Sequence, residues 1–581
     1  MKPIANANFH DFRKNSLIGP RWKPCLIALL ALACPAGAIA GTWNWGTASG
    51  SWHAAENWVS LTDPGTVPST DTASTVVNLT NGTTLSPSVT TLTSDWAAGR
   101  DSSITINSHN TLTLSAGLLV SKTGSSLTNH GIIQASSVGA LNSSGSATKS
   151  NDGTIQALSG GTLSFLGFGP LTNTGGLILA KSGGTIAIQG SSIITGGTLK
   201  SEAGGTIHRD TAYNVGPSLT LNSVTVDNQG TFTSNYDSDS VNTQTLQIQV
   251  NLGADTVFTN AANALTQIRN TGTGGLSNGN RNSLFNVNAG ASFRNNGTLL
   301  IENNATRTGS LTVQAATFGI ASEATEFSNS GTIKVIANTT GTGATAAFTS
   351  AKSITNGGIV HIKGNPNNEF ATFSVTGTGN DYTQSGSGTQ RTVLERGGAL
   401  SAARNVTINA GSLGGVGSVS GVTTIGGNAV LFAGETFAGT AGAGILAFAN
   451  DLILSDDAEV KFGLGLDTAT SGRVTLAGDL FLGMNLTLTL SDLSEGNWIS
   501  GATYRLFDLA SGTVYGDLAH LSLALPTGWT AALSSGPGGT GFLDATLTRT
   551  AVPEPSSMSL LLGSVTLVIA LTRRYRRMIS V

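Results

Sequence analysis

Cysteine is the scarcest residue of this 581-residue chain, and both copies, Cys25 and Cys34, lie within the first 40 residues. The rest of the chain has no thiol, which excludes a disulfide framework, a cysteine nucleophile and a thiolate metal site there. Charged residues make up only 10% of the chain and its formal net charge is −3, which argues against the basic patches that bind nucleic acid. Stability must therefore come from packing and hydrogen bonds.

Sequence motifs for catalysis are also lacking. There is no Gly-x-Ser-x-Gly elbow, phosphate-binding P-loop or dinucleotide fingerprint, and the seven histidines are scattered along the chain. We therefore expect no enzyme, no cofactor and no bound metal. The alternative is a β-helix enzyme that degrades polysaccharide, because the carboxylates of such a site come from different coils and need not be close in sequence.

Two groups of acidic residues come closest to a binding site. Asp237 and Asp239 could chelate calcium, but the glycine and the terminal glutamate of an EF-hand loop are missing. A solvated loop is the simpler interpretation. The second group, Asp456, Asp457 and Glu459, is interpreted as a charged turn between two strands.

The first 40 residues have the organisation of an export signal. Five basic residues precede an apolar stretch at 25–33, and Ala38-Ile39-Ala40 places small residues where a signal peptidase cleaves. We predict a signal helix in residues 1–40 with Ala38 and Ala40 as the cleavage residues. A lipoprotein attached at Cys34 is the alternative.

The last thirty residues contain three blocks in a fixed order. Pro553-Glu554-Pro555 comes first and is incompatible with a helix, because each proline lacks an N–H and fixes φ. An apolar run at 558–571 follows, and a helix over 556–572 would be roughly 25 Å long, against about 30 Å of hydrocarbon. The arginines that end the tail can snorkel and should stay on the cytoplasmic side. They are Arg573, Arg574, Arg576 and Arg577. We therefore predict one C-terminal transmembrane helix.

This order of Pro-Glu-Pro, apolar helix and arginines, within residues 552–581, resembles the PEP-CTERM sorting signal of Gram-negative bacteria that produce exopolysaccharide. The resemblance implies that Pro553, Glu554 and Pro555 are recognition residues for an exosortase-like processing enzyme. It also implies a precursor anchored in the inner membrane that is later found at the cell surface or outside the cell. Removal of both signals would leave 20 basic and 30 acidic residues, a net charge of −10.

The body of the chain predicts all-β structure, because it combines 76 glycines with many threonine, valine and isoleucine residues. A degenerate Asn-x-Gly repeat followed by an alternating apolar strand runs through residues 101–400. Its copies begin at Asn129, Asn151, Asn173, Asn228, Asn295, Asn329 and Asn356. The first two intervals are 22 residues, about one coil of a β-solenoid.

From this repeat we predict an elongated, right-handed parallel β-helix. Asn and Gly would adopt positive φ at the corner between two strands, and the asparagines would stack and hydrogen-bond along the axis. Pairs of alternating aliphatic residues would point inward, namely Ile104/Ile106, Leu112/Leu114 and Ile186/Ile188. Since Asn-Gly is also a hairpin signal, a series of antiparallel hairpins is the alternative.

Residues 41–100 hold half of the tryptophans of the chain within a short stretch, at Trp43, Trp45, Trp52 and Trp58. Such a start resembles that of bacterial surface proteins of the autotransporter-passenger type. One interpretation is an aromatic platform that stacks on sugar rings. The other, which we prefer, is a core cluster that caps the open end of the solenoid.

Residues 401–550 form a related but distinct segment. The sequence Gly411-Ser412-Leu413-Gly414-Gly415-Val416-Gly417 resembles the autotransporter-associated β-strand repeat, although the proline of its usual Ala-Pro-Gly turn is missing. Strands are predicted at 451–454, 459–464, 473–476, 480–490, 504–508 and 541–549. We expect a C-terminal β-repeat that caps the solenoid.

These observations predict an exported, non-enzymatic structural or adhesion-type protein of the cell surface or extracellular matrix. Its expected partners are the processing enzyme, exopolysaccharide and other copies of itself, and its many serines and threonines could carry glycans. An autotransporter adhesin would need a C-terminal barrel of amphipathic strands, and the chain ends in an apolar helix. A tail-anchored periplasmic protein is a further alternative.

Overall fold

The protein is described here by a computed structural model. The description covers residues 42–45, 49–52, 54–55, 58–60, 76–79, 88–92, 96–98, 100–120, 122–143, 147–210, 218–236, 246–271, 281–305, 314–338, 344–365, 370–434, 442–550 and 557–578. The chain divides into two units, Met1–Ile39 and Ala40–Val581. The predicted signal helix, the cleavage residues Ala38 and Ala40, and the motif Pro553-Glu554-Pro555 lie outside the described residues.

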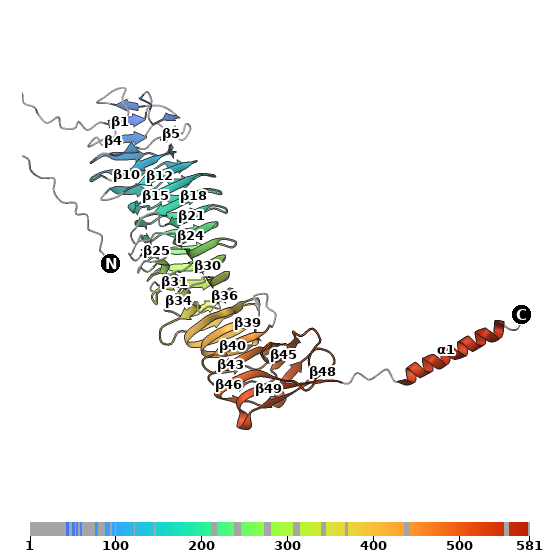
Figure 1. Cartoon of the computed structure of the whole chain (residues 1–581). Coiled ribbons are helices and arrows are strands. Elements are labelled where there is room, and N and C mark those ends of the chain that lie inside the picture. Colours follow the sequence, from blue (N-terminus) through green and yellow to red (C-terminus); the bar gives the residue numbers. More distant parts are fainter. Residues whose placement is uncertain are drawn as a thin grey trace, which may run out of the picture. The chain divides into compact units, whose positions relative to one another are not determined.

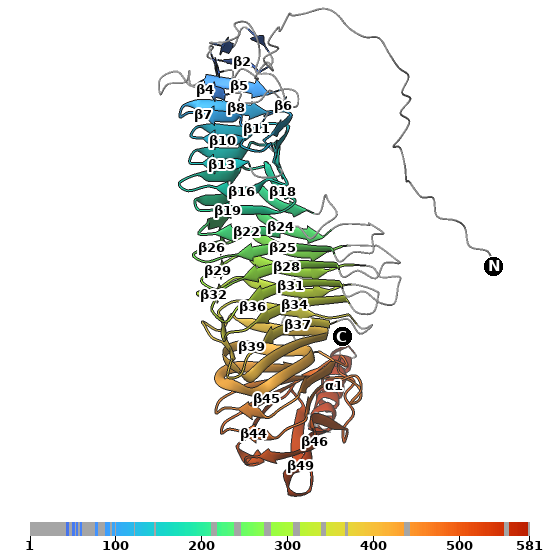
Figure 2. The ribbon, with the colours of Figure 1, turned by 90° about the vertical axis from the view of Figure 1, so that its left-hand side faces the viewer.

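The body is built from coils of three strands each. From β4 to β36, each strand pairs in parallel with the strand three places further along the chain. Thus β7 (Ser103–Ile106) pairs with β10 (Ser126–Asn129), and the next two strands repeat the same relation. Figures 1 and 2 show the coils as successive layers. The predicted parallel β-solenoid is confirmed, and the alternative of antiparallel hairpins is wrong for these coils because their pairing is parallel.

The three strands of each coil form three sheet faces, here called faces A, B and C. Face A contains β4 (Val76–Leu79), β7, β10, β13 (Thr148–Asn151), β16 (Gly169–Thr172), β19 (Ser192–Thr195), β22 (Ser218–Asn222), β25 (Leu246–Leu252), β28 (Arg281–Val287), β31 (Gln314–Ile320), β34 (Ala344–Ser350) and β37 (Phe370–Val375). Face B contains β5 (Ser88–Leu92), β8 (Asn110–Leu114), β11 (Ile132–Ala135), β14 (Thr154–Ala157), β17 (Leu177–Ala180), β20 (Thr198–Ser201), β23 (Thr225–Asn228), β26 (Val257–Asn260), β29 (Ser292–Asn295), β32 (Glu326–Asn329), β35 (Ile354–Asn356) and β38 (Tyr382–Gln384). Face C contains β6 (Trp96–Ala97), β9 (Gly117–Leu119), β12 (Val138–Asn142), β15 (Thr162–Leu166), β18 (Thr185–Gln189), β21 (Thr206–Asp210), β24 (Thr231–Tyr236), β27 (Leu265–Asn270), β30 (Thr298–Asn303), β33 (Thr332–Ala337) and β36 (Ile359–Lys363).

The asparagines of the repeat form two hydrogen-bonded ladders at two different corners. At the corner between faces A and B, Asn129 Nδ2 donates to Asn151 Oδ1 over 2.6 Å and Asn151 Nδ2 donates to Asn173 Oδ1 over 2.6 Å. A second ladder lies at the corner between faces B and C, with 2.7–2.8 Å between successive side chains. It joins Asn228, Asn260, Asn295, Asn329 and Asn356. The predicted stacking of asparagine along the axis is confirmed. The same sequence motif lies at the corner between faces A and B in the first ladder and at the corner between faces B and C in the second.

At most copies the glycine of Asn-x-Gly has a different role from the predicted one, whereas Gly175, at φ 79°, has the predicted positive φ. Gly131, Gly153, Gly297 and Gly331 are absent from the described residues with positive φ. An added Cβ at Gly331 would meet the carbonyl oxygen of Gly297 in the preceding coil at 2.1 Å, and the other three meet similar obstacles at 2.2–2.3 Å. The glycine is therefore required because neighbouring coils approach closely there, and not because the backbone is left-handed.

The repeat lengthens most at one corner. In the early coils face C connects quickly to face A, as between β15, which ends at Leu166, and β16, which begins at Gly169. Later the chain adds residues at this connection, for example between Asn270 and Arg281. The spacing of the ladder asparagines consequently rises from 22 residues to as many as 35. Insertions at one corner leave the two ladders and the three faces in register.

The interior is filled by inward residues in columns. The predicted inward aliphatic pairs are confirmed, because Ile104, Ile106, Leu112, Leu114, Ile186 and Ile188 are all buried. Further along, phenylalanines replace them, and the register places Phe285, Phe318, Phe348 and Phe373 in one column. The rings of Phe348 and Phe373 stack with 4.1 Å between centroids. Burial of such large side chains supplies stability that a chain without disulfides needs.

Antiparallel strands lie at both ends of the parallel stack. At the start, β1 (Thr42–Trp45) pairs antiparallel with β3 (Trp58–Ser60) and parallel with β4, while β2 (Ser49–Ser51) pairs with β5. The strand β39 (Arg391–Ala433) passes through residues 400 and 401 without a break. Further strands extend the stack: β40 (Gly444–Phe448), β41 (Leu452–Leu454), β42 (Glu459–Leu464), β43 (Gly472–Leu476), β44 (Leu480–Leu482), β45 (Thr487–Asp492) and β47 (Ser522–Ala524).

The last strands of the body close it with antiparallel pairing. The strand β49 (Thr540–Arg549) pairs antiparallel with both β46 (Thr503–Tyr515) and β48 (Trp529–Ser535). Two short 3-10 helices, η2 (Leu518–His520) and η3 (Pro537–Gly539), join these strands. The prediction of one strand over 480–490 is wrong, because residues 483–486 form a turn between β44 and β45. Gly483 and Asn485 explain that turn, since both residue types favour turn conformations.

Within the described parts of the chain there is one α-helix, α1 (Ser557–Met578), which follows the predicted motif. It starts one residue after the predicted start and runs beyond the predicted end at residue 572. Among the described residues, no helix combines the length and the apolar content that crossing a membrane requires. The predicted transmembrane helix therefore stays a prediction.

Candidate functional surfaces

The arginines of the tail all belong to the last turns of α1. Arg573, Arg574 and Arg576 are exposed, and so are the apolar residues between Val565 and Leu571. The side chain of Arg577 lies outside the description. The helix thus brings an apolar segment and a cluster of positive charge together on one continuous element. This is a surface with two chemically distinct ends.

The tryptophans near the N-terminus are not available to a ligand. Trp43, Trp45, Trp52 and Trp58 are at most 5% exposed, and Trp96 joins them. The rings contact edge to face, with 4.9 Å between the centroids of Trp45 and Trp58 and 4.8 Å between those of Trp52 and Trp58. Trp58 Nε1 donates to the carbonyl oxygen of Trp52 over 2.7 Å. The interpretation as a sugar-stacking platform is therefore corrected, because these rings cover the end of the aliphatic interior.

The acidic residues serve the backbone of neighbouring coils. Asp456 Oδ1 accepts a hydrogen bond from the amide of Met484 over 2.7 Å, and Asp479 Oδ1 accepts one from the amide of Thr513 over 2.8 Å. Glu459 accepts from the hydroxyl of Thr489 over 2.9 Å. The charged turn is thus part of the coil-to-coil contacts. Asp237 and Asp239 lie outside the described residues.

Other charged side chains form ion pairs between adjacent coils. On face B, Arg294 contacts Glu326 at 2.7 Å, and Lys200 contacts Asp227 at 2.9 Å. The hydrogen bond from Arg294 holds the pKa of Glu326 below its usual value. Among the described residues, no group of three histidine, cysteine, aspartate or glutamate side chains is placed to hold a metal ion. Pairing with a cation leaves these carboxylates poorly suited to proton abstraction.

One lysine lies inside the solenoid. Lys149 is 2% exposed, and its Nζ donates to Ser143 Oγ over 2.8 Å and lies 5.2 Å from the centre of the Phe168 ring. Burial lowers the pKa of the Lys149 ammonium below its usual value. The register places Lys149 between Leu127 and Leu171 in an otherwise aliphatic column. A serine beside a buried lysine can act as a nucleophile, but Ser143 is fully buried and no substrate can reach it.

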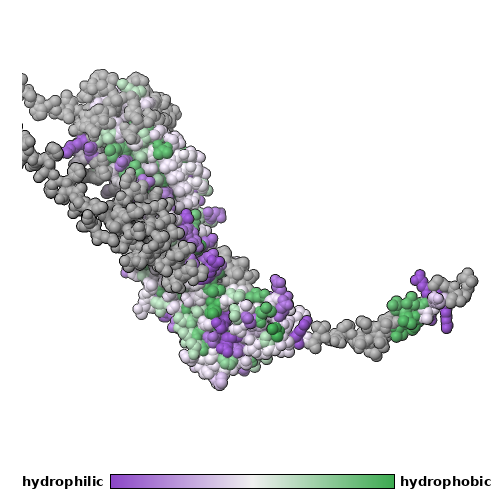
Figure 3. Space-filling view, viewed as in Figure 1, coloured by the Kyte–Doolittle hydropathy of each residue, from purple (hydrophilic) through white to green (hydrophobic). Residues whose placement is uncertain are grey.

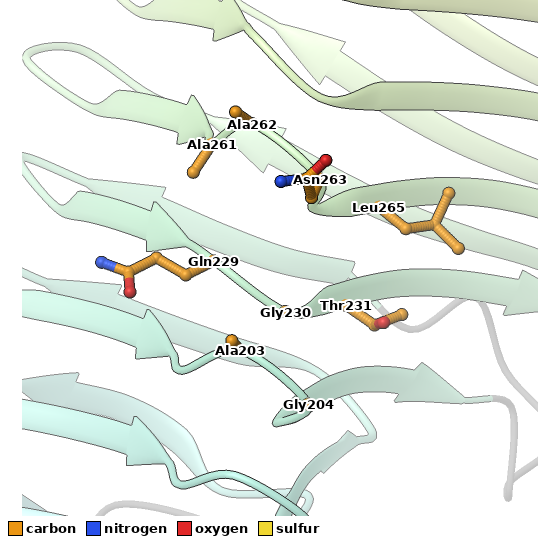
Figure 4. A pocket seen from close by; sticks show the side chains of 9 residues that line it. All are labelled: Ala203, Gly204, Gln229, Gly230, Thr231, Ala261, Ala262, Asn263 and Leu265. Carbon is orange, nitrogen blue, oxygen red and sulfur yellow. The ribbon is translucent and has the colours of Figure 1, made fainter.

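A shallow hollow of about 500 Å³ lies beside the second asparagine ladder. Figure 4 shows the side chains that line it, which come from three successive turns at the corner between faces B and C. They are Ala203, Gly204, Gln229, Gly230, Thr231, Ala261, Ala262, Asn263 and Leu265. None of them is charged, and most are small. The hollow can take part in weak polar contact but offers no acid, base or nucleophile of its own.

Exposed apolar side chains gather on the C-terminal coils. Phe481 and Tyr515 pair across β44 and β46 with stacked rings, 4.9 Å between centroids, and are 36% and 48% exposed. Met484, nearby in sequence, is 57% exposed. Figure 3 shows hydrophobic and hydrophilic residues side by side over this end of the solenoid. Sequence patterns missed this surface, because an alternating strand does not reveal which of its two faces stays open.

Comparison with known proteins adds no assignment. Neither a scan against protein-family models nor a search of curated proteins gives a match for this chain.

Proposed function

We propose that this chain is an exported, non-enzymatic structural protein of the cell surface or extracellular matrix, associated with exopolysaccharide. In this proposal the first 40 residues direct export and are cleaved after Ala40. Pro553-Glu554-Pro555 is then recognised by an exosortase-like enzyme at the inner membrane, and the body is released or attached outside the cell. The solenoid is expected to wind to the right, as connections between parallel strands usually do.

The observation that carries the proposal is the position of α1. The helix begins at Ser557, directly after the two prolines, and places its exposed arginines at the far end. In the sequence, a proline pair that cannot be helical is thus followed by an apolar helix and a positive cluster. A processing enzyme can read such a segment separately from the folded body, because the last strand of the body, β49, ends at Arg549.

The geometry of the body supports a structural role. Its ladders, ion pairs and backbone contacts connect each coil with the next one and require no disulfide or cofactor. Its charged groups are used in pairs, as between Arg294 and Glu326. A repeated surface of this kind suits many weak contacts with a repeated partner, since linked sites raise the overall affinity without any strong single contact.

The test is a double substitution, Pro553→Ala/Pro555→Ala, expressed in native cells and followed by cell fractionation. We expect the unmodified chain outside the cell and the variant retained in the inner membrane. A matched control is Pro526→Ala/Pro537→Ala, which also removes two prolines but leaves the motif intact, and it should be exported normally. Export of both variants would contradict the proposed recognition, and retention of the unmodified chain would indicate a tail-anchored periplasmic protein.

A further inference from the structure

Face A differs from the other two faces in having no ionisable side chain among its described outward residues from β7 to β37. The register aligns these outward residues from coil to coil. In the five strands β7, β10, β13, β16 and β19 most of them carry a hydroxyl group. We call these eight residues the hydroxyl face: Ser103, Thr105, Ser126, Thr128, Thr148, Ser150, Thr172 and Thr195.

The hydroxyls of this face are regularly spaced. Thr105, Thr128, Ser150, Thr172 and Thr195 follow one another at directly paired positions of five adjacent strands. Paired parallel strands lie about 4.8 Å apart, so the column presents one hydroxyl at each such step. The hydroxyl face thus repeats its chemistry along the axis of the coils.

These hydroxyls are also free to bind. Within the hydroxyl face the structure gives a single side-chain hydrogen bond, from Ser150 Oγ to Thr128 Oγ1 over 3.4 Å, which is long and weak. Thr148, Thr172 and Thr195 are exposed, and the other members are half-buried. By contrast, outward polar groups of face B are engaged, as in the pair of Lys200 and Asp227. The hydroxyl face therefore has donors and acceptors that are open to a ligand.

The chemistry of this face selects for an uncharged ligand. A charged group brought against it would lose hydration and meet no opposite charge, which is costly. The processed chain would also be acidic, at a net charge of −10, and would repel an anionic polymer. A neutral polymer whose hydroxyls recur along its length can instead exchange hydrogen bonds with every coil, and linked contacts reinforce one another.

We infer that the hydroxyl face binds an uncharged polysaccharide along the axis of the solenoid. This inference rests on the proposed association with exopolysaccharide and names its chemical class and its contact surface. The ligand contacts come from serine and threonine hydroxyls, and the tryptophans near the N-terminus have no part in them because they are buried.

The experiment measures binding of the purified full chain to hydroxyethylcellulose and dextran as neutral probes and to alginate as an anionic probe, by affinity gel electrophoresis. The test variant is Thr128→Val/Thr172→Val/Thr195→Val, which removes three hydroxyls and keeps β-branched side chains. The matched control is Thr154→Val/Thr198→Val/Thr225→Val on face B. Circular dichroism and thermal unfolding verify that both variants fold.

We expect binding to at least one neutral probe and a loss of about tenfold or more in the test variant, since each lost hydrogen bond weakens binding severalfold. The control variant should bind like the unmodified chain. Equal losses in both variants, binding to alginate alone, or binding to neither neutral probe would overturn the inference. So would self-association that disappears in the test variant. Because the purified chain is used, failure here leaves the export experiment unaffected, and the two results can be told apart.

Discussion

The second asparagine ladder allows a quantitative prediction for Asn295→Ala. Asn295 Oδ1 accepts from Asn260 Nδ2 over 2.7 Å, and its Nδ2 donates to Asn329 Oδ1 over 2.7 Å and to the carbonyl oxygen of Thr332 over 3.1 Å. The side chain is fully buried. Removing three hydrogen bonds at about 1 kcal/mol each, with Asn329 Oδ1 left unsatisfied, should cost about 3 kcal/mol, within a range of roughly 2–5 kcal/mol.

The neighbouring Asn296→Ala is the matched control. Asn296 Oδ1 accepts one hydrogen bond, from Ser330 Oγ over 2.7 Å, and this contact is exposed. Its loss should cost less than about 0.5 kcal/mol, as is usual for surface substitutions. The two variants differ by one residue in position and remove the same side chain. Any difference between them therefore reports on burial and on the ladder.

The assay combines urea unfolding with hydrogen exchange. In a solenoid each coil contacts only its neighbours, so the amides of β26, β29 and β32 should lose protection while those of β10 and β13 keep it. Alanine occurs elsewhere in this corner column, at Ala135, Ala157 and Ala180. The alternative outcome is therefore that Asn295→Ala changes the free energy of unfolding little. Equal costs for Asn295→Ala and Asn296→Ala would refute the reasoning that the ladder stabilises the fold.

Three further predictions follow from the packing. Gly331→Ala should lower the free energy of unfolding in urea by more than about 2 kcal/mol, because its Cβ would meet the carbonyl oxygen of Gly297. Gly319→Ala should change it little, because a Cβ there would meet only side-chain atoms and the residue has no positive φ. Lys149→Leu should stabilise by about 1 kcal/mol near neutral pH. Burial lowers the pKa of Lys149 in the folded chain below its usual value of 10.5. Between the pKa values of the folded and the unfolded chain, the unfolded chain therefore holds more protons, and the free energy of unfolding rises with pH. Unfolding measured at several pH values should show this rise in the unmodified chain and not in the variant. Trp52→Ala should lower the free energy of unfolding by about 3–5 kcal/mol. Hydrogen exchange should show that amide protection is lost in the first coils, and a loss of protection spread evenly over the body would contradict a local cap.

The sequence repeat was sufficient to predict the coil but not its register. Asn-x-Gly indicated a corner with stacked asparagines, and the ladders from Asn129 and from Asn228 confirm it. The repeat could not show that these ladders occupy different corners, because the motif is the same and only the strand pairing differs. The role of glycine was misjudged for a related reason, since a close approach between coils is a tertiary contact.

For the interior and the surfaces as well, features that follow from strand geometry could be predicted from the sequence, and features that depend on the alignment of the coils could not. Alternation correctly identified inward residues such as Ile104 and Ile186, because the two-residue period follows from strand geometry. The phenylalanine column ending at Phe373 depends on how coils of unequal length align, although the recurrence of phenylalanine in successive repeats was a usable signal. The hydroxyl face depends on the same alignment: Thr105 and Thr195 are 90 residues apart in the sequence and share one column.

Processing at both ends of the chain is tested most directly by the intact mass of the protein recovered from outside native cells. We expect a chain that begins at Gly41 and lacks the arginine tail, with any excess mass attributable to glycans on serine or threonine. An extracellular chain that retains residues 573–577, or a chain found only in membranes with both ends intact, would contradict it.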